Sequence, residues 1–144
     1  MTGLSFKAAQ QGFFDRAKVI NAVNRAARKN LSRFGAYVRT RAKTSIRKRQ
    51  GPSEPGKPPH SHVGLLRNLI FFAWDSARRA VVIGPVLINK PTGAPENLEY
   101  GGEADMPDGK GKTKRVTIKR RAYMGPAFDA EKPGLMAMWA DSVR

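Results

Sequence analysis

The feature that most constrains the fold is a proline-free stretch over residues 13–49, in which small or apolar side chains recur every three or four positions. This spacing places them on one face of an α-helix. A helix over 13–48 would be about 54 Å long, whereas a globule of 144 residues has a gyration radius of about 15 Å. Part of the helix must therefore project or meet another subunit, and Gly35 favours a bend or break. The apolar stripe comprises Phe14, Ala17, Ile20, Val23, Ala27, Leu31, Phe34, Val38, Ala42 and Ile46.

Two segments are predicted to be flexible. Residues 50–62 contain four prolines, which remove backbone donors and fix φ at values unsuited to a helix interior or a central strand. Residues 103–114 are polar and glycine-containing and show neither helical nor strand periodicity. We expect a long extended loop in the first segment and a mobile excursion in the second.

The middle of the chain predicts a hairpin. Residues 69–74 are rich in aromatic and β-branched side chains, which favours a strand. Residues 75–79 supply a turn and residues 80–83 the returning strand, which Gly84 and Pro85 end.

We predict one α+β domain over residues 1–144, with a long N-terminal helix, a small antiparallel β-sheet and a C-terminal helix packed on the sheet. A short turn of helix is expected at 64–68 and a third strand at 116–118. In the C-terminal helix Pro126 suits the first turn, whereas Pro133 favours a start or a kink.

The composition excludes several classes of protein. The absence of cysteine excludes disulfide scaffolds, cysteine-ligated zinc sites and iron–sulfur clusters. No stretch approaches the roughly 18 apolar residues of a membrane span, and the N-terminus lacks the apolar run of a secretory signal. We therefore expect a soluble protein, assembled in the cytoplasm and without a membrane partner.

The net charge of +16 is unevenly distributed, because residues 1–50 contribute +12, residues 51–109 contribute −2 and residues 110–144 contribute +6. On a helical projection six basic residues fall within about 80° of one another, opposite the apolar stripe. Like charges four positions apart destabilise an isolated helix by about 0.2–0.5 kcal/mol each. An external acidic surface or nucleic-acid phosphate is expected to compensate. This basic stripe comprises Lys18, Arg25, Lys29, Arg33, Lys43 and Arg47.

Two further charged regions follow along the chain. The carboxylates of the middle segment predict an acidic patch that faces a neighbouring subunit, and its members are Glu96, Glu99, Glu103, Asp105 and Asp108. A second basic region flanks the predicted third strand and consists of Lys114, Arg115, Lys119, Arg120 and Arg121. An acidic patch on one subunit that meets the basic helix of the next would produce head-to-tail contacts.

No catalytic constellation stands out. His60 and His62 lie on the same side of an extended segment, but no third metal ligand is within sequence reach. Lys112 and Thr113 follow a glycine, yet Met106 stands where a phosphate-binding loop requires its first glycine. We therefore expect no enzymatic activity, cofactor or metal, and we assign the strand aromatics such as Trp74 to core packing in preference to base stacking.

The order of five pieces resembles the tail-completion, or head–tail joining, family of neck and minor tail proteins in long-tailed bacteriophages and prophages. The first piece is the long basic N-terminal helix. Gly101 and Gly102, at the end of the fourth piece, require permissive backbone angles. The other four pieces are Pro55-Gly56-Lys57-Pro58-Pro59 leading to Val63-Gly64-Leu65-Leu66-Arg67-Asn68-Leu69-Ile70, Val82-Ile83-Gly84-Pro85, Glu99-Tyr100-Gly101-Gly102, and Arg121-Ala122-Tyr123-Met124-Gly125-Pro126-Ala127-Phe128.

The resemblance implies a non-enzymatic structural protein of the virion neck, assembled in the bacterial host cytoplasm. It implies a homo-oligomeric ring, hexameric with the symmetry of the tail or alternatively dodecameric. Such a ring joins the head connector to the tail tube and lets DNA pass, with neighbouring neck, connector, tail-terminator or tail-tube proteins as partners. Because tight phosphate binding would retard DNA, we expect the basic stripe to meet mainly protein, with non-specific DNA contact in addition.

Two other functions stay open. The net charge and the basic stripe also fit a nucleic-acid-binding module, ribosome-associated or nucleoid-like, without a sequence-reading motif. An enzyme that processes DNA during packaging would require a catalytic or metal-binding group, for which Glu99, Glu103 and Asp105 are the only cluster.

Overall fold

A computed structural model of the chain describes residues 15–86, 93–107 and 111–142. The fold is α+β, as the sequence predicts, but it has two small antiparallel sheets of two strands each where we expected one sheet. The elements are α2 (Arg16–Ser45), α3 (Leu65–Asn68), β1 (Ile70–Asp75), β2 (Ala80–Pro85), α4 (Ala94–Tyr100), β3 (Gly102–Pro107), β4 (Thr113–Ile118) and α5 (Met124–Trp139).

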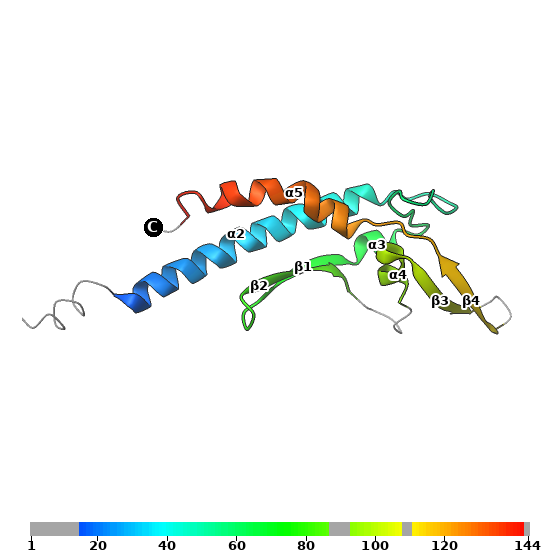
Figure 1. Cartoon of the computed structure of the whole chain (residues 1–144), viewed down its shortest axis with the longest axis horizontal. Helices are drawn as coiled ribbons and strands as arrows, with labels where there is room; N and C mark the ends of the chain where they lie inside the picture. Colours follow the sequence, from blue (N-terminus) through cyan, green and yellow to red (C-terminus); the bar gives the residue numbers. More distant parts are fainter. Residues whose placement is uncertain (1–14, 87–92, 108–110, 143–144) are drawn as a thin grey trace, which may run out of the picture.

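The elements are arranged along α2, which gives the molecule an elongated shape (Figure 1). Helix α5 packs along one side of α2, and the β1–β2 hairpin packs along another. The short helix α4 and the β3–β4 hairpin lie together at the end where α2 finishes. The N-terminal turns of α2 extend beyond the β1–β2 hairpin, so the predicted excess length of this helix is confirmed.

Helix α2 is capped at its start and runs through its central glycine. The Asp15 side chain accepts a hydrogen bond from the backbone nitrogen of Lys18 at 3.0 Å, which satisfies a free N–H of the first turn. The helix is continuous through Gly35. A Cβ atom at Gly35 would lie 2.8 Å from Val81 Cγ2 and 3.2 Å from Phe72 Cδ2. The glycine therefore allows β1 and β2 to approach the helix closely.

The first hairpin pairs Ile70 with Pro85 at one end and Asp75 with Ala80 at the other. Its turn forms because Asp75 Oδ1 accepts hydrogen bonds from the backbone nitrogens of Ala77, at 2.9 Å, and Arg78, at 3.0 Å. The predicted strands and turn are confirmed, as is the short helix before them.

The second hairpin pairs β3 with β4, from Gly102 opposite Ile118 to Pro107 opposite Thr113. The predicted third strand at 116–118 is confirmed, but it belongs to this separate sheet. Our prediction of an excursion at 103–114 is wrong for residues 103–107 and 113–114, which form strands; residues 108–110 lie outside the described residues. The two strands share few apolar positions, so their sequences lack the alternation that normally identifies a strand.

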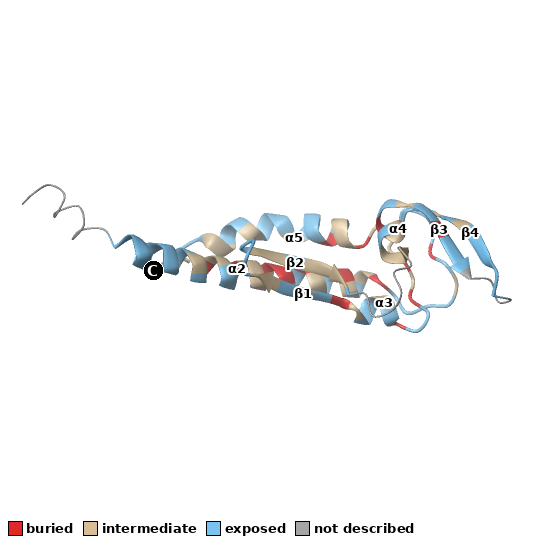
Figure 2. Cartoon of the chain, turned by 90° about the horizontal axis from the view of Figure 1, so that it is seen from below, coloured by how far each residue is buried: buried red, intermediate tan, exposed pale blue. Residues whose placement is uncertain are grey.

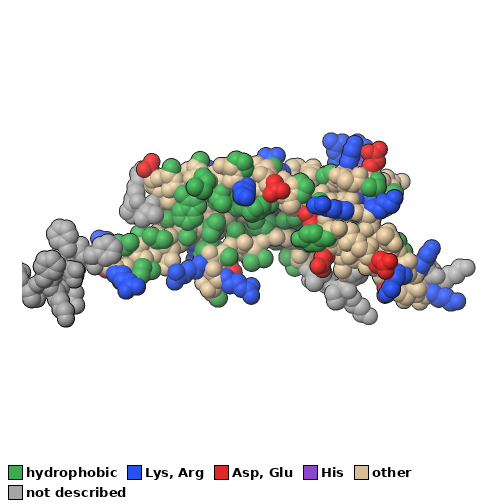
Figure 3. Space-filling model, viewed as in Figure 1, with side chains coloured by type: hydrophobic (Ala, Val, Ile, Leu, Met, Phe, Trp, Pro, Cys, Tyr) green, Lys and Arg blue, Asp and Glu red, His purple; other side chains and the backbone are tan. Residues whose placement is uncertain are grey.

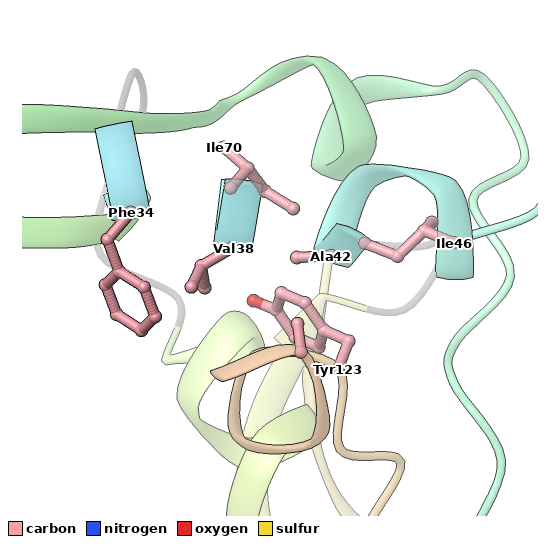
Figure 4. Close-up of a cluster of buried hydrophobic side chains, with 7 residues drawn as sticks. Phe34, Val38, Ala42, Ile46, Ile70 and Tyr123 are labelled. Atoms are coloured by element: carbon pink, nitrogen blue, oxygen red, sulfur yellow. The ribbon is translucent and has the colours of Figure 1, made fainter. Parts of the chain in front are cut away.

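The core is small and centres on α2. The buried cluster in Figure 4 draws Phe34, Val38, Ala42 and Ile46 from α2 and the segment after it, together with Ile70 of β1 and Tyr123 before α5. These side chains point toward one another between the helix and the two segments that cover it. The four C-terminal members of the predicted apolar stripe are therefore buried, whereas Ile20 and Val23 near the N-terminal end are exposed. Figure 2 shows buried residues mainly in the central and α4-side parts of the molecule.

The C-terminal half departs from the prediction in two places. Residues 94–100 form α4, which we had not predicted because Pro95 and the neighbouring glycine suggested a loop; Pro95 instead occupies the first turn, where its missing N–H is tolerated. Helix α5 begins at Met124 and contains Pro133, so Pro133 does not start it. Helix α5 packs against α2 and contributes Ala127 to the cluster that contains Ile70 of β1.

Candidate interaction surfaces

The basic stripe lies along α2 and most of it is exposed, but Arg47 follows the end of the helix at Ser45, so our placement of Arg47 on the helix is wrong. Figure 3 shows Lys and Arg side chains projecting below the N-terminal half of the helix. Arg33 is held in place by its neighbour one turn later, since its Nε donates to the Tyr37 hydroxyl at 3.0 Å and its guanidinium lies 5.7 Å from the ring centroid. The exposed members of the stripe are Lys18, Arg25, Lys29, Arg33 and Arg47.

Lys43, the remaining member, is half-buried and belongs to a cationic cluster with Arg39 and Arg67. Its ammonium lies 5.6 Å from the Phe71 ring centroid, and the Arg39 guanidinium lies 5.7 Å from the same centroid. Burial lowers the pKa of Lys43, and repulsion from Arg39 and Arg67 lowers it further. Among the described residues no carboxylate forms an ion pair with these three cations. The cluster therefore concentrates uncompensated positive charge beside an exposed aromatic ring.

Arg39 and Arg67 were missed as members of this cluster by the sequence analysis. Arg39 lies one turn before Lys43 on α2, and Arg67 comes from the short helix α3, 24 positions later in the chain. Arg67 does belong to one of the motifs that resemble the phage family, the motif that begins at Val63. Its proximity to Lys43 depends on how α3 folds back on α2, which helical periodicity does not report.

The predicted acidic patch is largely occupied within the chain. Glu99 is buried, with 8% of its surface exposed. Its Oε2 accepts from the backbone nitrogens of Tyr123 and Met124, each at 2.9 Å, and its Oε1 accepts from Gly125 at 2.7 Å. These are free N–H groups at the start of α5, where a carboxylate also meets the positive end of the helix dipole. Glu99 is therefore a helix cap, and our prediction that it faces a neighbouring subunit is wrong.

Two other acidic residues pair with Arg115 across the second hairpin. Arg115 Nε lies 3.4 Å from Asp105 Oδ1, and its NH1 lies 3.7 Å from Glu103 Oε2. All three side chains are more than half exposed, so the pairs contribute little stability, but they reduce the charge of the patch. Glu96 is exposed on α4, and Asp108 lies outside the described residues.

The second basic region divides in the same way. Arg120 Nε donates to the Glu99 carbonyl at 3.1 Å, and Arg121 Nε donates to the Ser53 carbonyl at 2.9 Å. These two arginines bind the segment before α5 to α4 and to the proline-rich loop. Lys114 and Lys119 are exposed. Only part of this region is therefore available to a partner.

Several large hydrophobic side chains of α2 and α5 are exposed. Only nine hydrophobic residues are buried among the described residues. Hydrophobic side chains gather in the middle of the face shown in Figure 3, over α5 and the adjoining part of α2. Met136 of α5 is 78% exposed. The other large exposed hydrophobic residues of these two helices are Val19, Ile20, Val23, Tyr37 and Phe128.

The described residues contain no group of three or more His, Asp or Glu side chains placed to hold a metal ion. His60 Nδ1 lies 3.3 Å from the Gly51 carbonyl oxygen, and His62 is exposed. No helix in the described parts of the chain has both the length and the apolar character needed to cross a membrane.

The observed surfaces define a small α+β protein with one long helix, exposed apolar faces and unpaired cations. No protein-family model, curated protein sequence or solved structure matches this chain. The function of the chain is therefore inferred from its exposed surfaces and from its sequence motifs.

Proposed function

We propose that this chain is a structural protein of a bacteriophage neck, whose copies assemble into a ring that joins the head connector to the tail tube. The observation that carries the proposal is the set of large hydrophobic side chains that are exposed on α2 and α5, beside a small buried core. Large exposed apolar areas are characteristic of interaction sites. In a closed ring each subunit would present one such face to the next.

The family-like motifs support the same proposal because two of them meet in space. Glu99 of the Glu99-Tyr100-Gly101-Gly102 piece caps the first residues of α5, which belong to the piece that begins at Arg121. The Arg121 backbone nitrogen also donates to the Leu98 carbonyl at 2.7 Å. A Cβ at Gly101 would lie 3.4 Å from the Arg120 nitrogen. The two pieces thus form one structural junction, which explains why they would occur together.

The charge distribution supports the proposal that the ring also binds an acidic partner that is not a copy of this chain. Each copy contributes +16, so a homo-oligomer accumulates positive charge however its subunits meet. Most described carboxylates are already engaged within the chain, including Glu99, Asp105 and Glu131, which pairs with Arg41. An acidic neighbouring ring or passing DNA would supply the missing negative charge.

Assembly of the purified full chain tests the proposal. Sedimentation velocity over a range of concentrations and electron microscopy should show closed rings, with six-fold or twelve-fold symmetry. Met136→Lys should weaken assembly, because it places a charge on an exposed apolar position of α5. Thr117→Lys adds the same charge at an exposed position of β4 and is the control. A chain that stays monomeric at every concentration and is absent from purified virions would exclude a neck ring.

A nucleic-acid-binding module is the second candidate. A cavity of about 460 Å³ between α2 and the first hairpin is lined by Arg25, Arg28, Arg79 and Trp74, a combination that suits phosphate contact and base stacking. Trp74 is only partly buried and lies outside the core cluster, so our assignment of it to core packing is wrong. This function predicts steep salt dependence, with the logarithm of the duplex affinity falling by about 0.9 per neutralised phosphate for each unit of log salt. Arg25→Ala with Arg28→Ala should reduce that slope. Binding that is undetectable at physiological salt would remove this candidate.

A further inference from the structure

A second cavity, of about 670 Å³, lies between the last turn of α2 and the proline-rich loop that follows it. Arg47, Arg49, Lys57 and His60 line it. The loop is held against the helix end because the Ser61 backbone nitrogen donates to the Arg47 carbonyl at 3.0 Å. Basic side chains are also visible around this end of the molecule in Figure 3.

The cavity has more positive than negative charge. Among the described residues that line it, Glu54 is the only acidic one, and it pairs with Lys57 at 3.2 Å. Neither Arg47 nor Arg49 forms an ion pair with a carboxylate of the described residues. Two of the residues that line the cavity are therefore arginines without an anionic partner among the described residues.

Ser53 provides an independent sign of a ligand. Only 6% of this residue is exposed, and its hydroxyl is buried without a hydrogen-bond partner among the described residues. A buried hydroxyl without a hydrogen-bond partner is destabilising. Ser53 is one of the residues that line the cavity, so we expect its hydroxyl to turn toward a bound acceptor oxygen and donate this hydrogen bond.

His60 adds a further polar group. Its Nδ1 lies 3.3 Å from the Gly51 carbonyl oxygen and donates to it, which holds the ring against the loop. The C-terminal end of a helix normally disfavours anions. Here the Thr44 and Ser45 hydroxyls donate to the Arg41 and Ala42 carbonyls, at 2.9 and 2.8 Å, and partly neutralise that effect.

We infer that this cavity binds a phosphate group. Arg47 and Arg49, from the segment after α2, and Ser53, from the proline-rich loop, supply donors that match a phosphate, which has more acceptor oxygens than a carboxylate. The inference extends the proposed neck function, in which the DNA backbone is the natural source of phosphate. A free phosphate or a nucleotide is the other source of the same chemistry. Binding is measured on the purified chain and does not depend on ring formation, so the two proposals fail separately.

The experiment titrates the full chain with inorganic phosphate, followed by NMR shifts of the Ser53 and His60 amides, and with a short DNA duplex, followed by fluorescence anisotropy. The paired substitutions Arg47→Ala and Arg49→Ala should weaken both interactions at least tenfold. They should also lower the duplex salt slope by about 1.8, since two phosphate contacts are lost. The paired substitutions Arg16→Ala and Lys132→Ala remove the same charge from exposed positions that belong neither to the cavity nor to the basic stripe or the second basic region, and should change either affinity less than threefold.

Ser53→Ala separates site chemistry from net charge. It removes the buried hydroxyl without altering charge or any hydrogen bond of that hydroxyl within the described structure. Phosphate affinity should fall by about threefold to tenfold, and circular dichroism should confirm an unchanged fold. Loss of both ligands upon cavity substitution supports a DNA-backbone site, and loss of inorganic phosphate alone supports a free phosphate or nucleotide site. The inference is overturned if neither ligand binds, or if the cavity and control variants lose affinity equally.

Discussion

The carboxylate of Glu99 lies 2.9 Å from the backbone nitrogen of Tyr123, although the two residues are 24 positions apart. The contact joins α4 to the start of α5, and the β3–β4 hairpin is the loop that it closes. One acidic side chain thereby replaces the capping residue that α5 lacks, since Tyr123 itself provides no side-chain cap.

Removing this cap should destabilise the protein. Glu99→Ala leaves three backbone N–H groups at the start of α5 without an acceptor, and we expect a loss of about 3 kcal/mol or more in the free energy of unfolding. Urea denaturation and hydrogen exchange at residues 123–125 measure it. Glu96→Ala changes an exposed position of α4, the helix that also contains Glu99, and should change stability by less than about 0.5 kcal/mol. Equal stabilities of the two variants would contradict the capping role.

Tyr123 should make stability pH-dependent in alkali. Burial raises its pKa to about 12, and the neighbouring Glu99 carboxylate contributes in the same direction. The unfolded chain releases the phenol proton near pH 10, so the stabilisation is complete below pH 10 and is lost as pH rises toward 12. Between pH 9 and pH 11.5 the wild type should lose about 2 kcal/mol more than Tyr123→Phe does. Parallel pH profiles of the two proteins would show that the phenol is not responsible.

Two helical glycines should respond oppositely to alanine. Gly35→Ala would place a Cβ 2.8 Å from Val81 Cγ2, so we expect a net destabilisation of about 1–3 kcal/mol despite the better helix propensity of alanine. A Cβ added at Gly134 of α5 would meet no atom of the described residues within 4 Å, and Gly134→Ala should stabilise by about 0.5–1 kcal/mol. Thermal unfolding of both variants provides the comparison. A stabilising Gly35→Ala would mean that the first hairpin does not pack closely on α2.

The cationic cluster around Phe71 should be sensitive to salt. Arg67→Ala removes one of the two charges that repel Lys43, so it should raise the pKa of Lys43 and increase stability at low salt. The gain should shrink as salt screens the repulsion. Lys119→Ala, at an exposed site, removes equal charge and should have the smaller effect. Denaturant unfolding at low and high salt, with Lys43 side-chain NMR, measures both quantities.

Local sequence patterns were sufficient for the elements with strong signals. The spacing of Phe34, Val38 and Ala42 identified the buried face of α2, and the residues around the Asp75 turn identified the first hairpin. Helix α4 and strand β3 were missed because their sequences lack a distinct hydrophobic period. Their positions depend on long-range contacts, such as those between Glu99 and α5 and between Asp105 and Arg115.

The candidate surfaces show the same division. The helical projection identified the basic stripe, whose exposed members include Lys18 and Arg25. It could not show that Lys43 lies beside Arg67, or that Ser53 and Arg49 line one cavity. Those neighbours come from segments separated by loops, and a periodicity within one helix contains no information about them.

The sequence by itself determined the α+β class, the long amphipathic helix, the first hairpin and the excess of positive charge, because these depend on residue type and on short-range spacing. Only the tertiary structure decided which charges are already paired. It buries Glu99 beneath α5, pairs Asp105 with Arg115, and leaves Arg47 and Arg49 beside a cavity without an acidic partner among the described residues. Charge is a property of each side chain, whereas its availability to a partner depends on distances that arise when remote segments pack together.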